Sequence, residues 1–199
     1  MPSALILIAQ GTEEMEYTIT YDILVRGGVK VQSALVGSSQ TSPTDPHGAK
    51  YVECTRGVKI VPDLRLPDLE GGKALDYDAI IVPGGGPGAN TIANNSDVQQ
   101  LINAMYGRGK IVACICAGSL AALKAKIGTD NDITSHPSVK DQLVKDYTYR
   151  EDRVVIADNL ITSRGPGTAF AFALAIVEAL QGKEKRDEIE GPMILPDKL

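Results

Sequence analysis

The feature that most constrains this chain is an apolar run that ends abruptly at a cysteine. Residues 110–115 read Lys-Ile-Val-Ala-Cys-Ile, and Cys116, Ala117 and Gly118 follow before a helical pattern over 120–127. A buried strand, a tight turn that carries a reactive side chain and an immediate helix make up a nucleophile elbow. Ala117 and Gly118 are small, as the strained backbone of such a turn requires. The sequence therefore makes Cys116 the candidate nucleophile.

The elbow also predicts how Cys116 is activated. The free N–H groups and the positive dipole end of the following helix favour a thiolate, and so should lower the pKa of the thiol. A buried structural cysteine is the common alternative. Cys114 fits that alternative because it lies inside the apolar strand, whereas Cys116 lies at the strand end.

The first 36 residues predict a parallel sheet. Residues 4–9 form a continuous apolar run, which is typical of a strand buried on both faces. A helix is expected from Glu13 to Arg26, with Thr12 as its N-cap, and a second strand over 29–36. This order recurs along the chain and predicts a three-layer α/β/α sandwich of flavodoxin-like type with a mostly parallel sheet. The length suits one domain, 1–199.

The remaining elements follow from apolar periodicity and turn residues. Further strands are expected over 78–82, 131–135, 146–150, 154–157 and 160–163, and helices over 89–107, 138–145 and 168–181. A short hairpin is expected over 51–61, a connector over 62–76, and a charged tail over 182–190 before an apolar segment, 193–195, that docks on the body. Residues 37–51 are rich in Ser, Thr, Pro and Gly and should form a loop, in which His47 is a solvated residue rather than a ligand.

Three turns follow the carboxyl ends of predicted buried strands. They are Gln-Gly-Thr at 10–12, the glycine run at 84–86, and Cys-Ala at 116–117. Ligands of open α/β sheets bind outside the carboxyl ends of the strands. We therefore expect the three turns to share one edge of the sheet and to form the functional site there.

Several groups near this edge could take part in chemistry. Glu13 and Glu16 lie one turn apart at a helix start, where they either complement the helix dipole or reach Cys116 as an acid–base carboxyl. His136, held extended by Pro137, either pairs with the cysteine or has no role. The N–H groups of Gly85 and Ala117 could bind a developing oxyanion, although Gly85 also fits a plain glycine turn. The residues alone leave these alternatives open.

Other function classes are disfavoured. The net charge is −5 and no basic block is present, so no nucleic-acid footprint is indicated. No apolar run approaches the roughly 20 residues that span a bilayer, and the N-terminus lacks the features of a signal peptide. The chain has neither a phosphate-binding loop motif nor zinc-ligand spacing. Three cysteines, two of them in one apolar strand, favour a reducing compartment, so we expect a cytoplasmic protein whose size also permits the nucleus.

Taken together, the motifs resemble the Parkinsonism-associated deglycase (DJ-one) family of the PfpI-like superfamily. The similar segments span nearly the whole chain and lie at 11–16, 82–85, 113–118, 135–137, and 162–168 with its continuation to 180. The resemblance implies that Cys116 is the nucleophile, that Glu16 is the carboxyl bonded to the thiolate with Glu13 beside it, and that His136 is their catalytic neighbour. It further implies that Gly85 and Ala117 form the oxyanion hole.

The same resemblance implies an activity. The family is associated with glutathione-independent conversion of methylglyoxal to lactate, with deglycation of early glycation adducts, and with cysteine oxidation as a stress signal. The expected substrates are small reactive dicarbonyls, methylglyoxal and glyoxal. The expected reaction needs no cofactor or metal, and the expected assembly is a homodimer. The competing expectation is a redox sensor that signals to a partner through oxidation of Cys116.

Two departures from the family pattern matter. The loop over 37–51 is longer than expected for animal members. Residue 117 is alanine, where protease-like and chaperone-like relatives carry histidine, so peptidase activity is disfavoured. Class I glutamine amidotransferases share the elbow but need a late His-x-Glu pair, which this sequence lacks.

Overall fold

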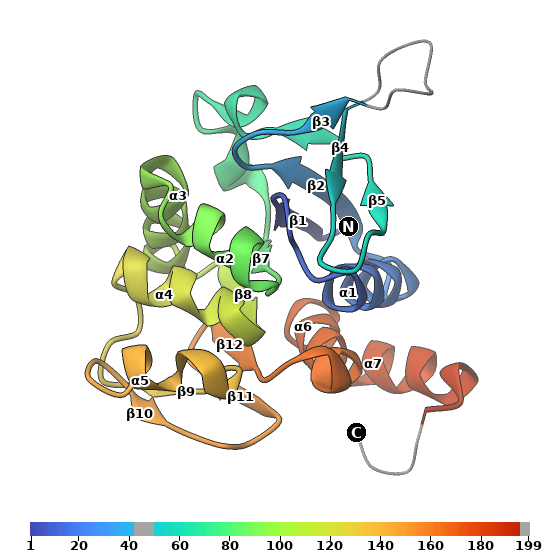
Figure 1. Ribbon diagram of the computed structural model, residues 1–199. Helices are drawn as coiled ribbons and strands as arrows, with labels where there is room; N and C mark the ends of the chain where they lie inside the picture. Colours follow the sequence, from blue (N-terminus) through green and yellow to red (C-terminus); the bar gives the residue numbers. More distant parts are fainter. Residues whose placement is uncertain (42–49, 196–199) are drawn as a thin grey trace.

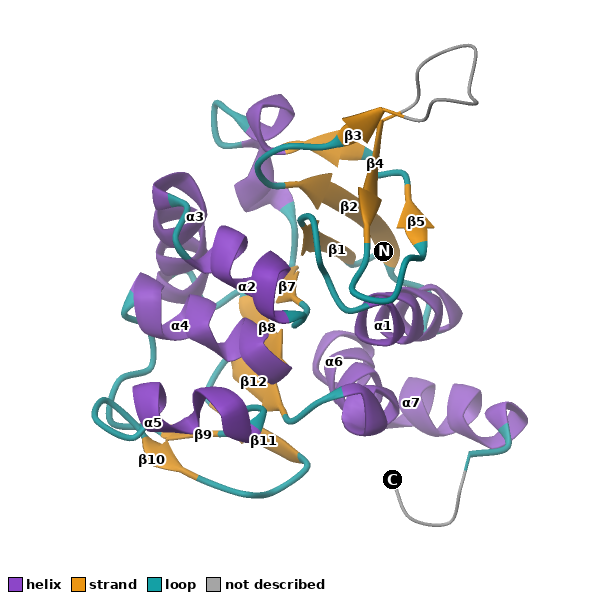
Figure 2. Cartoon of the chain, viewed as in Figure 1, coloured by secondary structure: helices purple, strands orange, loops and turns teal. Residues whose placement is uncertain are grey.

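The computed structural model describes residues 1–41 and 50–195 and contains a seven-stranded sheet between two layers of helices (Figures 1 and 2). The strand order is β11-β12-β8-β7-β1-β2-β6, and every neighbouring pair is parallel except β11 with β12. The strands are β1 Ser3–Ile8, β2 Lys30–Leu35, β6 Leu64–Arg65, β7 Ala79–Val82, β8 Ile111–Ile115, β11 Val154–Ala157 and β12 Leu160–Ser163. The predicted three-layer sandwich is confirmed. The prediction of one domain over 1–199 stays a prediction.

The helices divide between the two faces of the sheet (Figure 1). On one side lie α2 Gly86–Ala93, α3 Ser96–Gly107 and α4 Leu120–Ala125, and on the other lie α1 Glu14–Arg26, α6 Ala169–Gln181 and α7 Lys183–Glu190. Alternate residues of β1 face opposite layers: Leu5 and Leu7 pack with the first group, and Ile6 and Ile8 with the second. Because both faces are covered, each central strand is a continuous apolar run.

Two small sheets and one short helix complete the described fold. A three-stranded sheet consists of β3 Gln40–Thr41, β4 Lys50–Glu53 and β5 Lys59–Ile60, in which β4 and β5 form the predicted hairpin. A two-stranded parallel sheet pairs β9 Asp132–Ile133 with β10 Thr148–Tyr149, and α5 Lys140–Leu143 lies between them in the chain. His47 and most of the expected loop over 37–51 lie outside the described residues. Among the described helices, none is long and apolar enough to cross a bilayer.

Two expectations about helices were wrong. The helix expected over 89–107 is two helices, α2 and α3, because the Asn95 side chain accepts hydrogen bonds from the N–H groups of Asp97 and Val98 and starts a new helix. The N-cap of α1 is Glu13 rather than Thr12, whose hydroxyl instead accepts from the N–H of Ala9. After Cys116 the chain makes a 3-10 turn, and α4 starts at Leu120, the first residue of the expected helical pattern.

Two segments expected to be irregular have regular structure. The connector over 62–76 contains β6, which extends the main sheet beside β2. The charged tail over 182–190 is helix α7, in which Arg186 pairs with Glu190 and also reaches Glu178 of α6 at 3.0 Å. Ile189 of α7 is buried in the core on that side of the sheet, and Met193 beyond it packs there as expected, although Ile194 is exposed.

The capping role of Asn95 gives a test of the break between α2 and α3. Asn95→Ala should lower the free energy of unfolding by about 1 kcal/mol, because two N–H groups of the first turn lose their acceptor. Urea denaturation monitored by circular dichroism measures this change. Asn90→Ala, at an exposed position of α2, is the control and should change stability by less than half as much. Equal effects would contradict the capping role.

Candidate active site

The backbone at Cys116 has the strained geometry of a nucleophile elbow. Strand β8 ends at Ile115, and Cys116 has φ of +63°, a region that side-chain-bearing residues rarely adopt. A Cβ on Gly118 would lie 2.2 Å from the carbonyl oxygen of Val82, so only glycine lets this turn pack against β7. The structure therefore confirms the elbow, which presents the thiol at the carboxyl end of the sheet.

The glycine run after β7 brings the three predicted turns together. Gly85 has φ of +83°, and a Cβ there would lie 2.2 Å from the carbonyl oxygen of Gly11. The N–H of Glu13 donates to the carbonyl oxygen of Gly84 at 3.0 Å. A Cβ on Gly84 would lie 2.6 Å from Cβ of Cys116. The expectation that the turns share one edge of the sheet is confirmed. Their close contact requires glycine at positions 84 and 85, because a side chain there would collide with the neighbouring turns.

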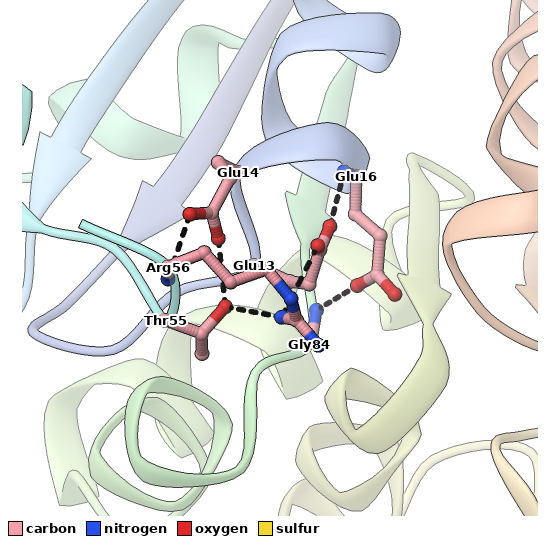
Figure 3. Close-up of polar contacts among 6 residues, drawn as sticks. All are labelled: Glu13, Glu14, Glu16, Thr55, Arg56 and Gly84. Atoms are coloured by element: carbon pink, nitrogen blue, oxygen red, sulfur yellow. Dashed lines mark hydrogen bonds and ion pairs between the residues drawn. The ribbon is translucent and has the colours of Figure 1, made fainter. Parts of the chain in front are cut away.

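Glu16 lies next to the thiol and is fully buried. Its Oε2 accepts the N–H of Gly84 at 2.6 Å, while the N–H of Glu16 donates to Oε2 of Glu13 at 2.8 Å (Figure 3). Both Glu16 Oε2 and Cys116 Sγ lie within 3 Å of where a Cβ of Gly84 would stand, so the carboxyl and the thiol flank the same point. Burial raises the pKa of Glu16 to about 7. Glu16 can therefore gain and lose a proton near neutral pH.

The expected lowering of the Cys116 pKa was wrong for the thiol beside an ionised Glu16. Burial and then the negative charge of Glu16 raise the pKa of Cys116 to about 12, while the N–H groups of Ala117 and Gly85 act in the opposite direction. The expected lowering rested on the helix end, and burial together with the charge of Glu16 outweighs that effect. When Glu16 holds the proton, its repulsion disappears and it becomes a hydrogen-bond donor, which favours the thiolate. The pair is best described as sharing one proton.

Cys114 shows that acidity alone does not single out the nucleophile. Burial raises the pKa of Cys114 to about 12 as well, but its side chain is fully enclosed. Cys116 is half-buried and lines a pocket of about 450 Å³. Access to this pocket distinguishes the two residues.

The pocket brings together groups from six segments of the chain. Its walls include Glu13, Gly85, Cys116, Ala117 and His136, which are all residues named from the sequence, and also Thr55, Arg56, Gly86, Ser138 and Pro166. His136 is exposed on its wall, and its Nδ1 bonds Ser138. Glu16 is fully buried and is not among these wall residues. The expected catalytic roles of all these residues stay predictions.

Sequence reasoning missed the residues that hold the hairpin over the pocket. The Glu14 carboxylate accepts the N–H of Arg56 and the hydroxyl of Thr55, both at 2.7 Å (Figure 3). Burial acts to raise the pKa of Glu14, but these hydrogen bonds hold that pKa below its ordinary value. The Arg56 guanidinium lies 3.6 Å from Glu13 at the pocket mouth. The only local signal was the expected turn at Arg56-Gly57, which carries no information about its partner 42 residues away.

The arrangement supports covalent chemistry on a small electrophile. A thiol, a carboxyl that titrates near pH 7, and two backbone N–H groups close to the sulfur suit the addition of a thiolate to a carbonyl. Among the described residues, no three His, Cys, Asp or Glu side chains are placed to share a metal ion.

Comparisons with known proteins agree with this description. Residues 2–179 match the profile of the DJ-1/PfpI family. The chain is 41% identical to the glutathione-independent glyoxalase DJR-1.2 of Caenorhabditis elegans, over 97% of this chain and 96% of the relative. It is 32% identical to the glutathione-independent glyoxalase DJ-1 of Schizosaccharomyces pombe, over 98% and 100%. The crystal structure of Drosophila melanogaster DJ-1beta superposes with a TM-score of 0.86 at 40% identity and covers 98% of each chain.

The buried carboxyl predicts a pH dependence of stability. Because the pKa of Glu16 rises from its ordinary 4.5 to about 7, the folded state keeps a proton that the unfolded state loses. The free energy of unfolding should therefore decrease as pH rises from about 4.5 to 7, and then level off. Urea denaturation at several pH values should show this decrease in the wild type and not in Glu16→Gln.

Glu14→Gln is the matched control for this experiment. The pKa of Glu14 is lowered, so its contribution to stability is present at neutral pH and is lost as pH falls. The Glu14→Gln substitution should therefore change the pH dependence in the opposite sense. Identical pH dependence in the wild type and in Glu16→Gln would show that the Glu16 pKa is not raised.

Proposed function

The chain belongs to the DJ-1/PfpI family, and we propose that it is a glutathione-independent glyoxalase (glyoxalase III, a carbon–oxygen lyase) that converts methylglyoxal to lactate at Cys116. The observation that carries the proposal is the buried Glu16 carboxyl, which titrates near pH 7 and lies beside a thiol on a nucleophile elbow. Two relatives that are similar over nearly their full length bear the same activity in their names. The substrate class is the small reactive dicarbonyls, including glyoxal.

The first step is addition to the aldehyde. The Cys116 thiolate attacks the aldehyde carbon, and the carbonyl oxygen becomes an alkoxide beside the N–H groups of Gly85 and Ala117. Protonated Glu16 gives its proton to this oxygen, which yields a neutral hemithioacetal and a carboxylate. A carboxyl whose pKa is about 7 is protonated often enough to donate here and basic enough to accept in the next step.

The second step moves hydrogen between the two substrate carbons. The Glu16 carboxylate removes the proton from the carbon bonded to sulfur, and an enediol forms as His136 gives a proton to the oxygen of the second carbon. Glu16 then returns its proton to the second carbon, and the hydroxyl proton on the first carbon passes to His136, which restores it. The first carbon is thereby oxidised to a thioester and the second is reduced to an alcohol. Because this oxidation and reduction are internal, no cofactor is required. Water then hydrolyses the thioester, releasing lactate and the Cys116 thiol.

The size and exposure of the pocket bear on larger substrates. The walls are open enough that His136 and Arg56 are exposed, so an early glycation adduct on a protein side chain could approach Cys116. We therefore include protein deglycase activity in the proposal. The chemistry would begin with the same attack of the thiolate on a carbonyl carbon.

A second candidate function is redox sensing through Cys116. The half-buried thiol is reachable from the pocket, and the Gly85 and Ala117 N–H groups near its sulfur could stabilise a sulfinate. Oxidation would then change how the protein binds a partner. The three free cysteines fit a reducing compartment, and we propose a cytoplasmic location that extends to the nucleus.

We also propose that the protein forms a homodimer. Met15 of α1 and Val58 of the β4–β5 hairpin are both about half exposed, and these two elements are joined by the bonds of Glu14 to Thr55 and Arg56. Exposed apolar side chains on adjoining elements are typical of an interface. A second copy of the chain would cover them.

Lactate formation tests the glyoxalase proposal. Wild-type protein incubated with methylglyoxal and no glutathione should form lactate, while Cys116→Ala and Glu16→Ala should form none above background, because each lacks a group that every turnover requires. Cys114→Ala is the matched control and should keep activity, since its thiol does not reach the pocket. A folded, reduced wild type that forms no lactate, or an active Cys116→Ala, would refute the proposal.

Mass spectrometry after peroxide treatment tests redox sensing. Cys116 should gain two oxygen atoms before Cys54 or Cys114, because only Cys116 lines the pocket while the other two are buried. Glu16→Gln should change the fraction of sulfinate at Cys116 without affecting the other two cysteines. Oxidation spread equally over the three cysteines would contradict this role.

A further inference from the structure

His136 is held by a residue that the sequence analysis did not single out. The backbone N–H of Ser138 donates to Nδ1 of His136 at 3.2 Å, and the Ser138 hydroxyl lies 2.8 Å from the same nitrogen. Both residues line the pocket that contains Cys116. The imidazole is therefore oriented by contacts on one ring nitrogen, which leaves Nε2 for other partners.

The backbone bond determines which ring nitrogen carries the proton. A backbone N–H can only donate, so Nδ1 has to present its lone pair to Ser138. A proton on Nδ1 would face this N–H and repel it. The hydroxyl of Ser138 can then also donate to Nδ1, and the proton of the neutral imidazole resides on Nε2.

The surroundings of the ring keep this arrangement in place. Pro137 keeps the backbone of His136 extended, with φ of −62° and ψ of 141°. On the other side, Ser135 donates its hydroxyl to the carbonyl oxygen of His136, and Tyr149 donates its hydroxyl to the carbonyl oxygen of Ser135. The Cδ2 edge of the ring, next to Nε2, faces Gly165, which has no side chain to block it.

We propose that Ser138 is a positioning residue that holds His136 in the Nε2–H tautomer, so that His136 serves the reaction as a hydrogen-bond donor to the enediol oxygen rather than as the base that removes the carbon-bound proton. This inference rests on the proposed glyoxalase reaction and refines the role of one residue in it. Glu16 is then the group that removes and returns the carbon-bound proton. A neutral imidazole is well suited to donating to an enediolate oxygen.

Nuclear magnetic resonance tests the tautomer without reference to activity. The chain has two histidines, so selective ¹⁵N labelling of histidine gives two ring systems, and His47→Gln assigns them. In the wild type at pH about 8, the bonded proton should be found on Nε2 of His136 and not on Nδ1. In Ser138→Ala, which keeps the backbone N–H and loses the hydroxyl, the proton should stay on Nε2 while the Nδ1 shift changes, because Nδ1 loses one of its two donors. A proton on Nδ1 in the wild type, or an unchanged Nδ1 shift in Ser138→Ala, would overturn the inference.

Kinetics test what the hydroxyl of Ser138 contributes to the reaction. Ser138→Ala should lower kcat about fivefold with little change in KM, which is the rate equivalent of losing one neutral hydrogen bond, and Ser138→Thr should restore most of it because it keeps the hydroxyl. A general loss of folding would not be rescued selectively by threonine. Equal kcat in the wild type and Ser138→Ala would count against the positioning role.

Two substitutions of His136 separate donor from base. The amide nitrogen of glutamine reaches the position of Nε2 and can donate but cannot act as a base, whereas asparagine reaches only the position of Nδ1. His136→Gln should therefore keep most of the wild-type kcat. His136→Asn should lower kcat about a hundredfold, which is the effect of removing one donor to a developing oxyanion. Equal loss in both variants would restore His136 as a base. If the wild type forms no lactate, the proposed function fails, and the resonance experiment still decides the tautomer.

Discussion

The close contact of a buried carboxyl with a half-buried thiol is the constraint on which the rest of this site depends. Glu16 Oε2 and Cys116 Sγ both lie within 3 Å of the point where a Cβ of Gly84 would stand, and each group is enclosed enough that ionisation of both at once is strongly unfavourable. One proton must therefore stay with the pair. The N–H of Gly84 donates to Oε2 of Glu16, and further backbone N–H groups lie near the sulfur. With these donors in place, the proton can move between the two side chains while the heavy atoms stay where they are.

The elements around the pair keep it in a strained but fixed geometry. The positive φ of Cys116 costs free energy, which the packing of β8 against β7 and β12 has to offset. Gly84, Gly85 and Gly118 lie where any side chain would collide with neighbouring turns. The parallel sheet therefore also determines where the site forms, because three such turns converge at the carboxyl ends of its strands.

A feature of the fold or the site could be predicted from the sequence when the residues that form it are close together along the chain. The elbow was predictable because strand, cysteine, small residues and helix are consecutive, and β11 and β12 were found at their observed bounds because their apolar runs are short and well delimited. The break at Asn95 was missed because it depends on the capping bonds of one side chain, and helix α7 was missed because it depends on contacts with another helix. The raised pKa of Cys116 and the bonds of Glu14 to the hairpin depend on residues far apart in the chain, which no local pattern records.

The same geometry explains why catalysis and oxidation compete at one atom. A hemithioacetal alkoxide and a sulfinate both place an oxygen one or two bonds from Sγ of Cys116, where the N–H groups of Gly85 and Ala117 lie and where protonated Glu16 can donate. Features that stabilise the reaction intermediate therefore also stabilise the oxidised cysteine. Because the thiol must be reduced to attack a carbonyl, each sulfinate formed removes one working site. An enzyme of this design becomes sensitive to oxidants without any further structural device, and sensitivity to peroxide follows from the chemistry that makes Cys116 a nucleophile.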